Sequence, residues 1–201
     1  PELASTDLHL VANDWSGSGN WSSRVGGKIA TVNGSPTKQP SVRFFDRSEI
    51  TNFTAANFLT LAADAAFTVN PGEAHSWELV LREVSSGTQQ FFLGRYPGAG
   101  MVYARFSTVG VEFAVVNDAS GQYIFAASTP TLSDVHYLWT LVVDLSIPKL
   151  WIYQNGVQLA TSTTTSGTLT PSNQTMGLGK TIGIDANPWL GSALEILHHT
   201  T

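Results

Sequence analysis

The sequence predicts an all-β protein that folds as a two-sheet antiparallel sandwich of the jelly-roll type. Almost every segment alternates apolar and polar residues with a period of two, as strands with one buried face do. These segments are short and are separated by Gly, Pro, Asn, Asp and Ser, and many short strands joined by turns are typical of sandwiches and jelly rolls. Only "NFTAANFLTLAADAAF" contains enough Ala and Leu to suggest helix, and its β-branched and aromatic neighbours limit this to a short helical turn.

The chain has 201 residues, which is long enough for a sizeable core, and we expect residues 1–201 to form a single domain with 1–6 as a short N-terminal arm. The alternating segments predict strands at Asp7–Asn13, Lys28–Val32, Val42–Asp46, Phe58–Ala63, Ala66–Val69, Ser76–Val84, Gln89–Leu93, Met101–Phe106, Gly110–Asn117, Gln122–Ala127, Tyr137–Asp144, Leu150–Gln154, Val157–Thr163, Thr181–Asp185 and Ala193–Leu197.

The stretch "KLWIYQNGVQLATST", residues 149–163, predicts a β-hairpin. Asn155 and Gly156 supply the two positive-φ residues of a type I′ turn, so we interpret Asn155 as a turn residue and not as a ligand. This turn sets the pairs Gln154–Val157, Tyr153–Gln158, Ile152–Leu159 and Trp151–Ala160. The core face then contains Leu150, Ile152, Val157 and Leu159, whereas Trp151 and Tyr153 share the other face.

Composition excludes several classes of function. Charged residues make up 12% of the chain, about half the usual share, and the net charge is −5 without a cluster of Lys or Arg. Nucleic acid is therefore not expected as a partner, because phosphate binding requires a basic face. No apolar run approaches the roughly 18 residues of a membrane span. The absence of cysteine excludes disulfides, thiolate metal sites and cysteine nucleophiles.

The segment "HYLWTLVVDLSIPKLWIYQNGVQLATST" resembles the part of laminin-G-like jelly rolls in which a Trp-bearing strand leads into a hairpin with an Asn-Gly turn. Upstream "SWELVLREVSSGTQQFFLGRYPGAGMVYARF" and downstream "TIGIDANPWLGSALEIL" are similar to the neighbouring strands of that family, and the resemblance covers roughly residues 58–197. It implies the concanavalin A-like lectin and glucanase superfamily, whose sandwiches serve as binding modules, adhesion domains, glycanases and virus coat parts, so it predicts the fold and not one function.

Catalysis is not expected. "WELVLREV" resembles the catalytic strand of laminarinase-like glycanases, which carries Glu, then Asp two residues on, then a second Glu. Retaining hydrolysis needs two carboxyl groups roughly 5 Å apart. Here Val80 replaces the Asp, and Glu78 and Glu83 are five residues apart, which places them on opposite faces of a regular strand. We therefore predict no catalytic residues.

The histidines do not form a metal-binding spacing, and no Asp and His flank a serine nucleophile. No metal or cofactor is predicted. Calcium is the one ion that the family resemblance leaves open, and no calcium-ligand motif supports it.

The segment "NDWSGSGNW", residues 13–21, is a candidate glycan-binding loop, which is the less favoured of two interpretations. Indoles in a Gly- and Ser-rich segment can stack on sugar rings, and Asp and Asn can hydrogen-bond to hydroxyls. The alternative is that the loop folds back and the indoles close one open end of the sandwich. The predicted carbohydrate-binding residues are Asp14, Trp15, Asn20, Trp21, Tyr96, Trp151, Tyr153 and Trp189.

Three functions remain open. The favoured one is a non-enzymatic structural and attachment protein on the surface of a phage or virus particle, such as a capsid decoration or fibre, with its own copies and capsid or tail proteins as partners. The N-terminus lacks the basic and apolar pattern of a secretory signal, which favours synthesis in the host cytoplasm and a virion location. The second is an extracellular carbohydrate-binding module that recognises surface glycans. The third is a glycan hydrolase or lyase.

Overall fold

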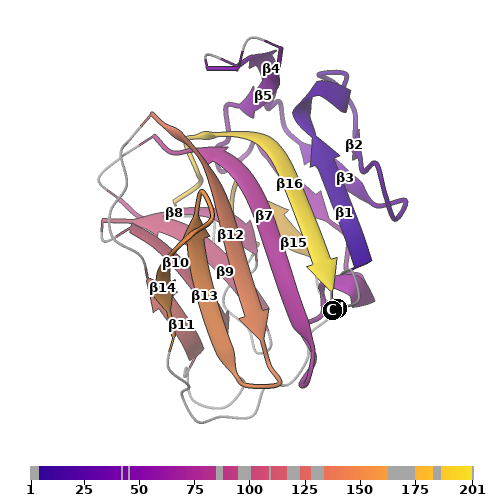
Figure 1. The fold of residues 1–201 in the computed structure, drawn as a ribbon. Coiled ribbons are helices and arrows are strands. Elements are labelled where there is room, and N and C mark those ends of the chain that lie inside the picture. Colours follow the sequence, from indigo (N-terminus) through magenta and orange to yellow (C-terminus); the bar gives the residue numbers. More distant parts are fainter. Residues whose placement is uncertain are drawn as a thin grey trace.

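The computed structural model describes residues 5–41, 43–44, 46–84, 88–94, 101–108, 110–116, 123–127, 134–162, 175–182 and 187–200. Within these ranges the chain forms sixteen strands, β1 to β16, and two short 3-10 turns, η1 (Ala12–Asp14) and η2 (Ala65–Phe67). The strands build two antiparallel sheets that face each other, with the larger strands of one sheet in front in Figure 1. The predicted all-β sandwich is confirmed.

The front sheet is here named sheet A. Its spatial order is β14 (Val157–Thr161), β13 (Lys149–Gln154), β12 (His136–Asp144), β7 (Ala74–Arg82), β16 (Ser192–Thr200), β5 (Ser48–Thr51) and β4 (Thr37–Pro40), and β1 (Ser5–Val11) also pairs with β16. Sheet B has the order β11 (Tyr123–Ala127), β10 (Gly110–Val116), β9 (Met101–Ser107), β8 (Gln90–Gly94), β15 (Met176–Leu178), β6 (Phe58–Leu61), β3 (Ile29–Asn33) and β2 (Trp21–Ser22). Of the predicted arm, residues 5 and 6 pair with the end of β16.

The core lies between the two sheets, because buried and partly exposed side chains alternate along the long strands. In β7 the side chains of Trp77, Leu79 and Leu81 are buried, and those between them are partly exposed. In β12, Trp139 and Leu141 repeat the pattern. Successive strand residues point to opposite faces, so each strand contributes one apolar row to the core and one mixed row to the surface. The outward residues of β7 and β12 are therefore partly exposed, apart from His136 at the start of β12.

The Asn155–Gly156 turn is confirmed, because φ is 50° at Asn155 and 80° at Gly156. Asn155 also accepts a hydrogen bond at Oδ1 from the Leu138 backbone N–H, at 3.0 Å, which ties the turn to β12. The predicted pairs Gln154–Val157 and Tyr153–Gln158 are present. Beyond them the register shifts by one residue, so that Ile152 pairs with Ala160 and Trp151 with Thr161. Val157, beside the turn, is exposed, and Leu159, at the bulge, is only partly buried, although both were predicted on the core face.

Several strand predictions were wrong. Residues 43, 44 and 46 of the predicted strand Val42–Asp46 form a turn between β4 and β5, and Ala65–Phe67 is a 3-10 turn where Ala66–Val69 was expected as a strand. Thr181 is not in a strand, and 183–185 lie outside the described residues. The short strands β2, β4, β5 and β15 were not predicted. Three of them are largely polar or very short, so alternation does not reveal them.

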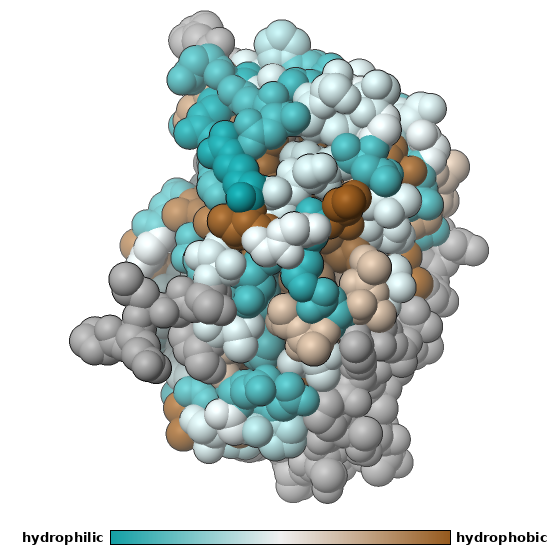
Figure 2. All heavy atoms as spheres, turned by 90° about the vertical axis from the view of Figure 1, so that its right-hand side faces the viewer, coloured by the Kyte–Doolittle hydropathy of each residue, from teal (hydrophilic) through white to brown (hydrophobic). Residues whose placement is uncertain are grey.

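The side of the molecule that carries β1, β2 and β3 faces the viewer in Figure 2. Its coloured surface is mostly hydrophilic or intermediate, and apolar surface occurs there as separate patches. Among the described residues, no helix has the length and the hydrophobicity needed to cross a bilayer.

Candidate functional site

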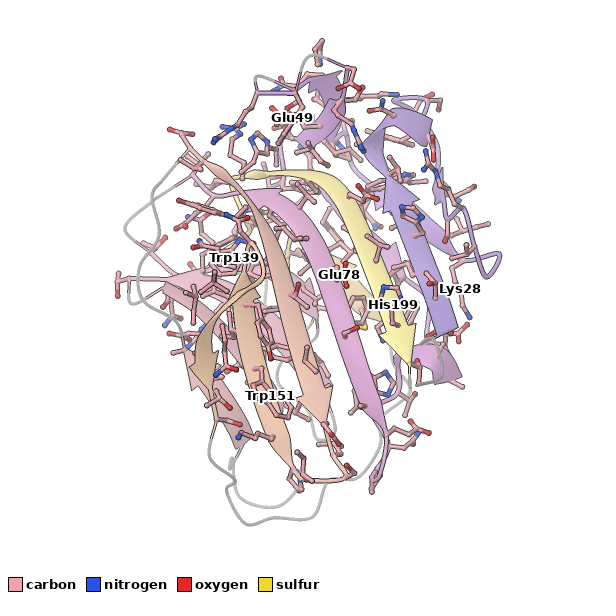
Figure 3. All side chains as sticks on the ribbon, viewed as in Figure 1. Lys28, Glu49, Glu78, Trp139, Trp151 and His199 are labelled. Atoms are coloured by element: carbon pink, nitrogen blue, oxygen red, sulfur yellow. The ribbon has the colours of Figure 1, made fainter. Side chains whose placement is uncertain are left out.

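The outer face of sheet A is the surface formed by the outward-pointing residues of β13, β12, β7 and β16. Strand register fixes its rows. Tyr153 lies opposite Thr140, Thr140 opposite Glu78, and Glu78 opposite Leu197. The next row toward the β12–β13 turn contains Trp151, Val142, Ser76 and His199. In Figure 3, Trp151, Glu78 and His199 lie on β13, β7 and β16 of the front sheet. Partly exposed aromatic, hydroxyl and carboxylate groups thus share one face.

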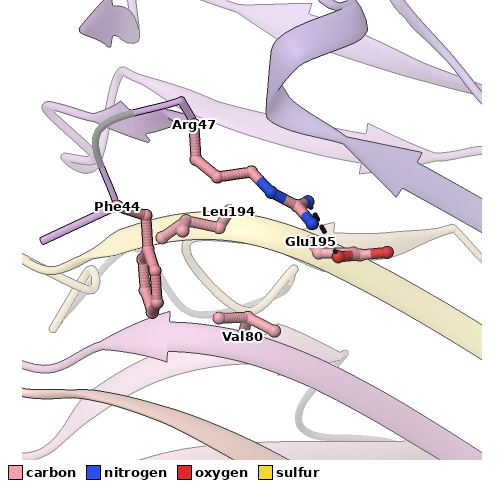
Figure 4. Close-up of a pocket in the computed structure, with 5 residues that line it drawn as sticks. All are labelled: Phe44, Arg47, Val80, Leu194 and Glu195. Atoms are coloured by element: carbon pink, nitrogen blue, oxygen red, sulfur yellow. Dashed lines mark hydrogen bonds and ion pairs between the residues drawn. The ribbon is translucent and has the colours of Figure 1, made fainter. Parts of the chain in front are cut away.

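A pocket opens at one end of this face, beneath the turn that joins β4 to β5. We name it the Phe44 pocket; it has a volume of about 180 Å³, and its lining comprises Phe44, Arg47, Val80, Leu194 and Glu195. Figure 4 shows the Phe44 ring directed toward β7 and the Arg47 side chain directed toward Glu195 on β16. The pocket therefore combines an apolar lining with one pair of opposite charges.

On the charged side of the Phe44 pocket, three side chains are linked in a row, namely Arg47, Glu195 and His9. Arg47 Nη1 donates to Glu195 Oε2 at 3.4 Å, and His9 Nε2 lies 2.7 Å from Glu195 Oε1. A carboxylate only accepts hydrogen bonds, so the His9 proton sits on Nε2. The Arg47 side chain is 45% exposed, so most of its donors remain free for a ligand that enters from the outer face.

Local hydrogen bonds hold the turn above the pocket. Arg47 N–H donates to the Phe44 carbonyl at 2.9 Å, and Ser41 N–H donates to the Arg47 carbonyl at 2.8 Å. Asn13 clamps the turn from outside, because its amide donates to the Asp46 carbonyl at 3.0 Å and accepts from the backbone of β5. The Phe44 ring meets the His136 ring edge-on, with centroids 5.5 Å apart, and is 38% exposed.

A buried carboxylate anchors the strands beneath this turn. Glu49 of β5 is 0% exposed and accepts hydrogen bonds from His136 Nε2 at 2.9 Å, Gln39 Nε2 at 2.8 Å and Ser192 Oγ at 2.8 Å, while Arg82 lies 3.4 Å away. Burial alone would raise the pKa of Glu49, but the hydrogen bonds and the Arg82 charge outweigh it and lower the pKa to about 2. Glu49 is thus a fixed anion that joins β4, β5, β7, β12 and β16.

Three of the predicted sugar-stacking indoles belong to the core. Trp15 is 2%, Trp21 0% and Trp189 1% exposed. Trp15 Nε1 donates to the Gly19 carbonyl at 2.9 Å, Trp21 Nε1 donates to the Val11 carbonyl at 3.0 Å, and Trp189 stacks on Phe53 with centroids 5.1 Å apart. Their ring faces pack inside the sandwich, which corrects the stacking role predicted for them and agrees with the alternative that the indoles close an end of the fold.

The polar residues of the same loop have internal partners. Asp14 pairs with Arg24, whose Nη2 donates to Oδ1 at 3.0 Å, and this hydrogen bond lowers the pKa of Asp14. Asn20 Oδ1 accepts from the Val32 backbone N–H at 3.3 Å. A second hollow of about 200 Å³ lies beside them, and its lining comprises Trp15, Gly17, Ser18, Gly19, Val32, Gly34, Ser35 and Pro36. Tyr96 lies outside the described residues.

Trp151 and Tyr153 are the predicted residues that the structure brings together on the outer face. Both alternate with buried Leu150 and Ile152 in β13, as the hairpin predicted. The Lys149 ammonium lies over the Trp151 ring, 5.3 Å from its centroid, within the range of a cation–π interaction. Four residues of this region were not predicted from the sequence, namely Phe44, Arg47, Glu195 and His9. An aromatic residue among the charges of "RFFDRSE" was the one signal for them.

Glu78 and Glu83, the two carboxylates of the strand that resembles a glycanase strand, lie on β7 and just after it. Glu78 lies on the outer face, where its cross-strand neighbours are Thr140 and Leu197, and Glu83 follows the end of β7. Neither neighbour is an acid that could serve as the second carboxyl group of a hydrolase. Among the described residues, no three His, Asp or Glu side chains converge as a metal site.

No protein-family model matches the sequence, and no curated protein sequence matches it. Solved structures do match. The binding domain of Paraclostridial Mosquitocidal Protein 1 aligns with a TM-score of 0.70 at 11% identity, over 95% of this chain and 48% of that chain. Domain 4 of AbnA, an extracellular arabinanase of Geobacillus stearothermophilus solved with arabinotriose, aligns with a TM-score of 0.67 at 12% identity, over 98% and 93% of the two chains.

A structure of botulinum neurotoxin type C, a toxin whose cell entry depends on interaction with two ganglioside molecules, aligns with a TM-score of 0.68 at 13% identity, over 97% of this chain and 47% of that chain. The chain thus spans about half the length of the matched toxin chains. These similarities confirm the concanavalin A-like jelly-roll sandwich that the sequence predicted. At such low identity they show the fold.

Proposed function

We propose that the chain is a carbohydrate-binding module and that its ligand lies on the outer face of sheet A. The observation that carries the proposal is the Phe44 pocket. It offers a half-exposed aromatic ring beside Arg47 and Glu195, at the margin of a face that also carries Trp151 and Tyr153.

This combination matches the chemistry of a sugar. One face of a sugar ring is lined by C–H groups and packs against an aromatic ring, while hydroxyls project from its edge. Arg47 supplies donors and Glu195 supplies acceptors, so neighbouring hydroxyls can bond to both in one orientation. Because Arg47 and Glu195 are already paired, they are placed before the ligand arrives, which reduces the entropy cost of binding.

The similar structures support the same class of function. One was solved with arabinotriose, and another belongs to a toxin whose cell entry depends on ganglioside molecules. The structures named above do not support the predicted phage or virus component, with capsid or tail proteins or further copies as partners and a virion location. The proposal therefore takes up the second function predicted from the sequence, with surface glycans as partners and an extracellular location.

The test is a glycan array followed by titration calorimetry with the best binder. We expect the wild type to bind, and we expect Phe44→Ala and Arg47→Ala each to weaken binding by at least tenfold. Arg24→Ala is the matched control, because Arg24 is also an exposed arginine in an ion pair but lies outside the Phe44 pocket. The absence of any glycan ligand, or equal loss in Arg24→Ala and Arg47→Ala, would refute the proposal.

A further inference from the structure

We infer that the ligand is an uncharged linear oligosaccharide that runs diagonally across sheet A, from the Phe44 pocket over Glu78 and Thr140 to Trp151 and Tyr153. This inference rests on the proposed function and adds to it the length, the direction and the charge class of the ligand. It depends on three features of the outer face, namely its dimensions, its unpartnered polar groups and its charges.

Strand register gives the dimensions. Val80 in the lining of the Phe44 pocket pairs with Leu138 on β12, and four residues further along β12, Val142 pairs with Trp151 on β13. Two strand spacings of about 4.8 Å and four residues of about 3.3 Å give a diagonal of about 16 Å. One sugar ring is too short to reach both ends of this path. A chain of about three to four rings is long enough to span the diagonal.

The middle of the path carries polar groups that have no protein partner. In the described part of the chain, the side chains of Ser76, Glu78 and Thr140 make no hydrogen bond and no ion pair. All three are partly exposed on the outer face and lie on neighbouring strands. Two hydroxyls and a carboxylate in this position offer both donors and acceptors to the hydroxyls of a ligand.

The charges along the path select against an anionic chain. Glu78 occupies its centre, and its strand neighbours Thr140 and Leu197 bring no positive charge to balance it. The cations lie at the two ends of the path: Arg47 is already paired with Glu195, and the Lys149 ammonium lies over the Trp151 ring. A chain with a carboxylate or sulfate on each unit would place like charges beside Glu78, which costs affinity. A neutral chain avoids this cost.

The inference is tested by calorimetric titration with neutral oligosaccharides of one linkage, from one to six units, chosen from the array. We expect the affinity of the wild type to rise up to about four units and then to remain constant. Trp151→Ala should weaken binding of the four-unit chain about three- to tenfold and leave binding of the one- and two-unit ligands unchanged. Phe44→Ala should weaken binding at every length.

Ile29→Ala is the control for Trp151→Ala, because Ile29 is an exposed apolar residue of sheet B. Tyr153→Ala repeats the test if Trp151→Ala does not fold. If the affinity were constant from one unit upward and Trp151→Ala had no effect, the pocket would bind a single sugar. That result would overturn the inference, while the proposed function would stand. No binding at any length would overturn both.

The charge class is tested separately with a uronic acid chain of the same length. We expect the wild type to prefer the neutral chain by about tenfold or more, and Glu78→Gln to reduce this preference several-fold. Equal affinity of the wild type for the two chains would overturn this part of the inference.

Discussion

His75 Nδ1 lies 3.1 Å from His198 Nε2, inside the sandwich where β7 and β16 run side by side. One N–H can serve this contact, because the other nitrogen must accept, and protonating both rings would place two positive charges together. Glu73 and Asp7 flank the pair, at 3.4 Å from His75 Nε2 and 3.5 Å from His198 Nδ1, while His199 and Lys28, which is paired with Asp64, add positive charge nearby. Burial and these positive neighbours lower the pKa of His198 to about 3, and burial lowers the pKa of His75.

The first prediction concerns the pH dependence of stability. The unfolded chain binds a proton on His198 below about pH 6.5, whereas the folded protein does so only near pH 3. The contribution of this group is therefore complete above pH 6.5, and the free energy of unfolding falls by about 1.4 kcal/mol per pH unit as the pH decreases below that value. Urea unfolding between pH 7.5 and pH 5 measures the slope. Glu49 does not contribute to the slope in this pH range, because its contribution to the free energy of unfolding is lost only below about pH 4.5.

His198→Leu should be less stable than the wild type at pH 7.5 and should have a shallower dependence on pH. His199→Gln, which changes the partly exposed neighbour on the outer face, should keep the slope of the wild type. Parallel curves for the wild type and His198→Leu would show that the buried pair does not cause the effect.

The second prediction separates core from surface tryptophans. Trp21→Ala should lower the free energy of unfolding by about 3–5 kcal/mol, because it leaves a cavity between the sheets. Trp151→Ala should lower it by about 1 kcal/mol, because this ring lies on the outer face. Urea denaturation of both variants measures the difference. Similar losses in the two would contradict the assignment of Trp21 to the core.

The third prediction concerns Glu49. Glu49→Ala leaves His136 and Arg82 without their buried counterion and should destabilise the fold by about 3–5 kcal/mol. Glu78→Ala is the matched control, because Glu78 lies on β7 without a partner and should change stability by no more than about 0.5 kcal/mol. Thermal unfolding at pH 7.5 compares them. A neutral effect of Glu49→Ala would mean that the cluster does not anchor the strands.

The fourth prediction concerns the turn between β13 and β14. Asn155→Ala should cost about 1–3 kcal/mol, since Ala is strained at positive φ and lacks the oxygen that accepts from Leu138. Asn155→Gly removes only the hydrogen bond and should cost about 1 kcal/mol. Gln158→Ala, at an exposed position of the same hairpin, is the control. Equal losses for Asn155→Ala and Asn155→Gly would exclude a contribution of backbone strain.

The fold could be predicted from the sequence because burial alternates along the long central strands, as in β7 and β12. Where a strand is short and polar, as in β4 and β5, no alternation exists to read. The bulge in β14 could not be predicted either, because the turn fixes only the first pairs of a hairpin.

Prediction of the candidate site succeeded only where it depended on local sequence. Trp151 and Tyr153 were placed correctly because a two-residue turn fixes which face each residue takes. The burial of Trp15 and Trp21 depends on strands that are distant in the chain. The Phe44 pocket depends on contacts across 148 residues between Arg47 and Glu195 and across 186 residues between His9 and Glu195, and one sequence does not reveal such contacts.

β1 and β16 pair along their length, so that Ser5 lies opposite Thr200, whereas Glu195 pairs with Val11 at the other end of the same two strands. Thr200 lies five residue steps along β16 from the pocket residue Glu195, a distance of about 16 Å. A biosensor surface or a fluorescent fusion attached close to Ser5 or close to Thr200 would therefore meet the same corner of sheet A. We expect such an attachment to leave the Phe44 pocket uncovered, because its residue Glu195 lies at the opposite end of the β1–β16 pairing.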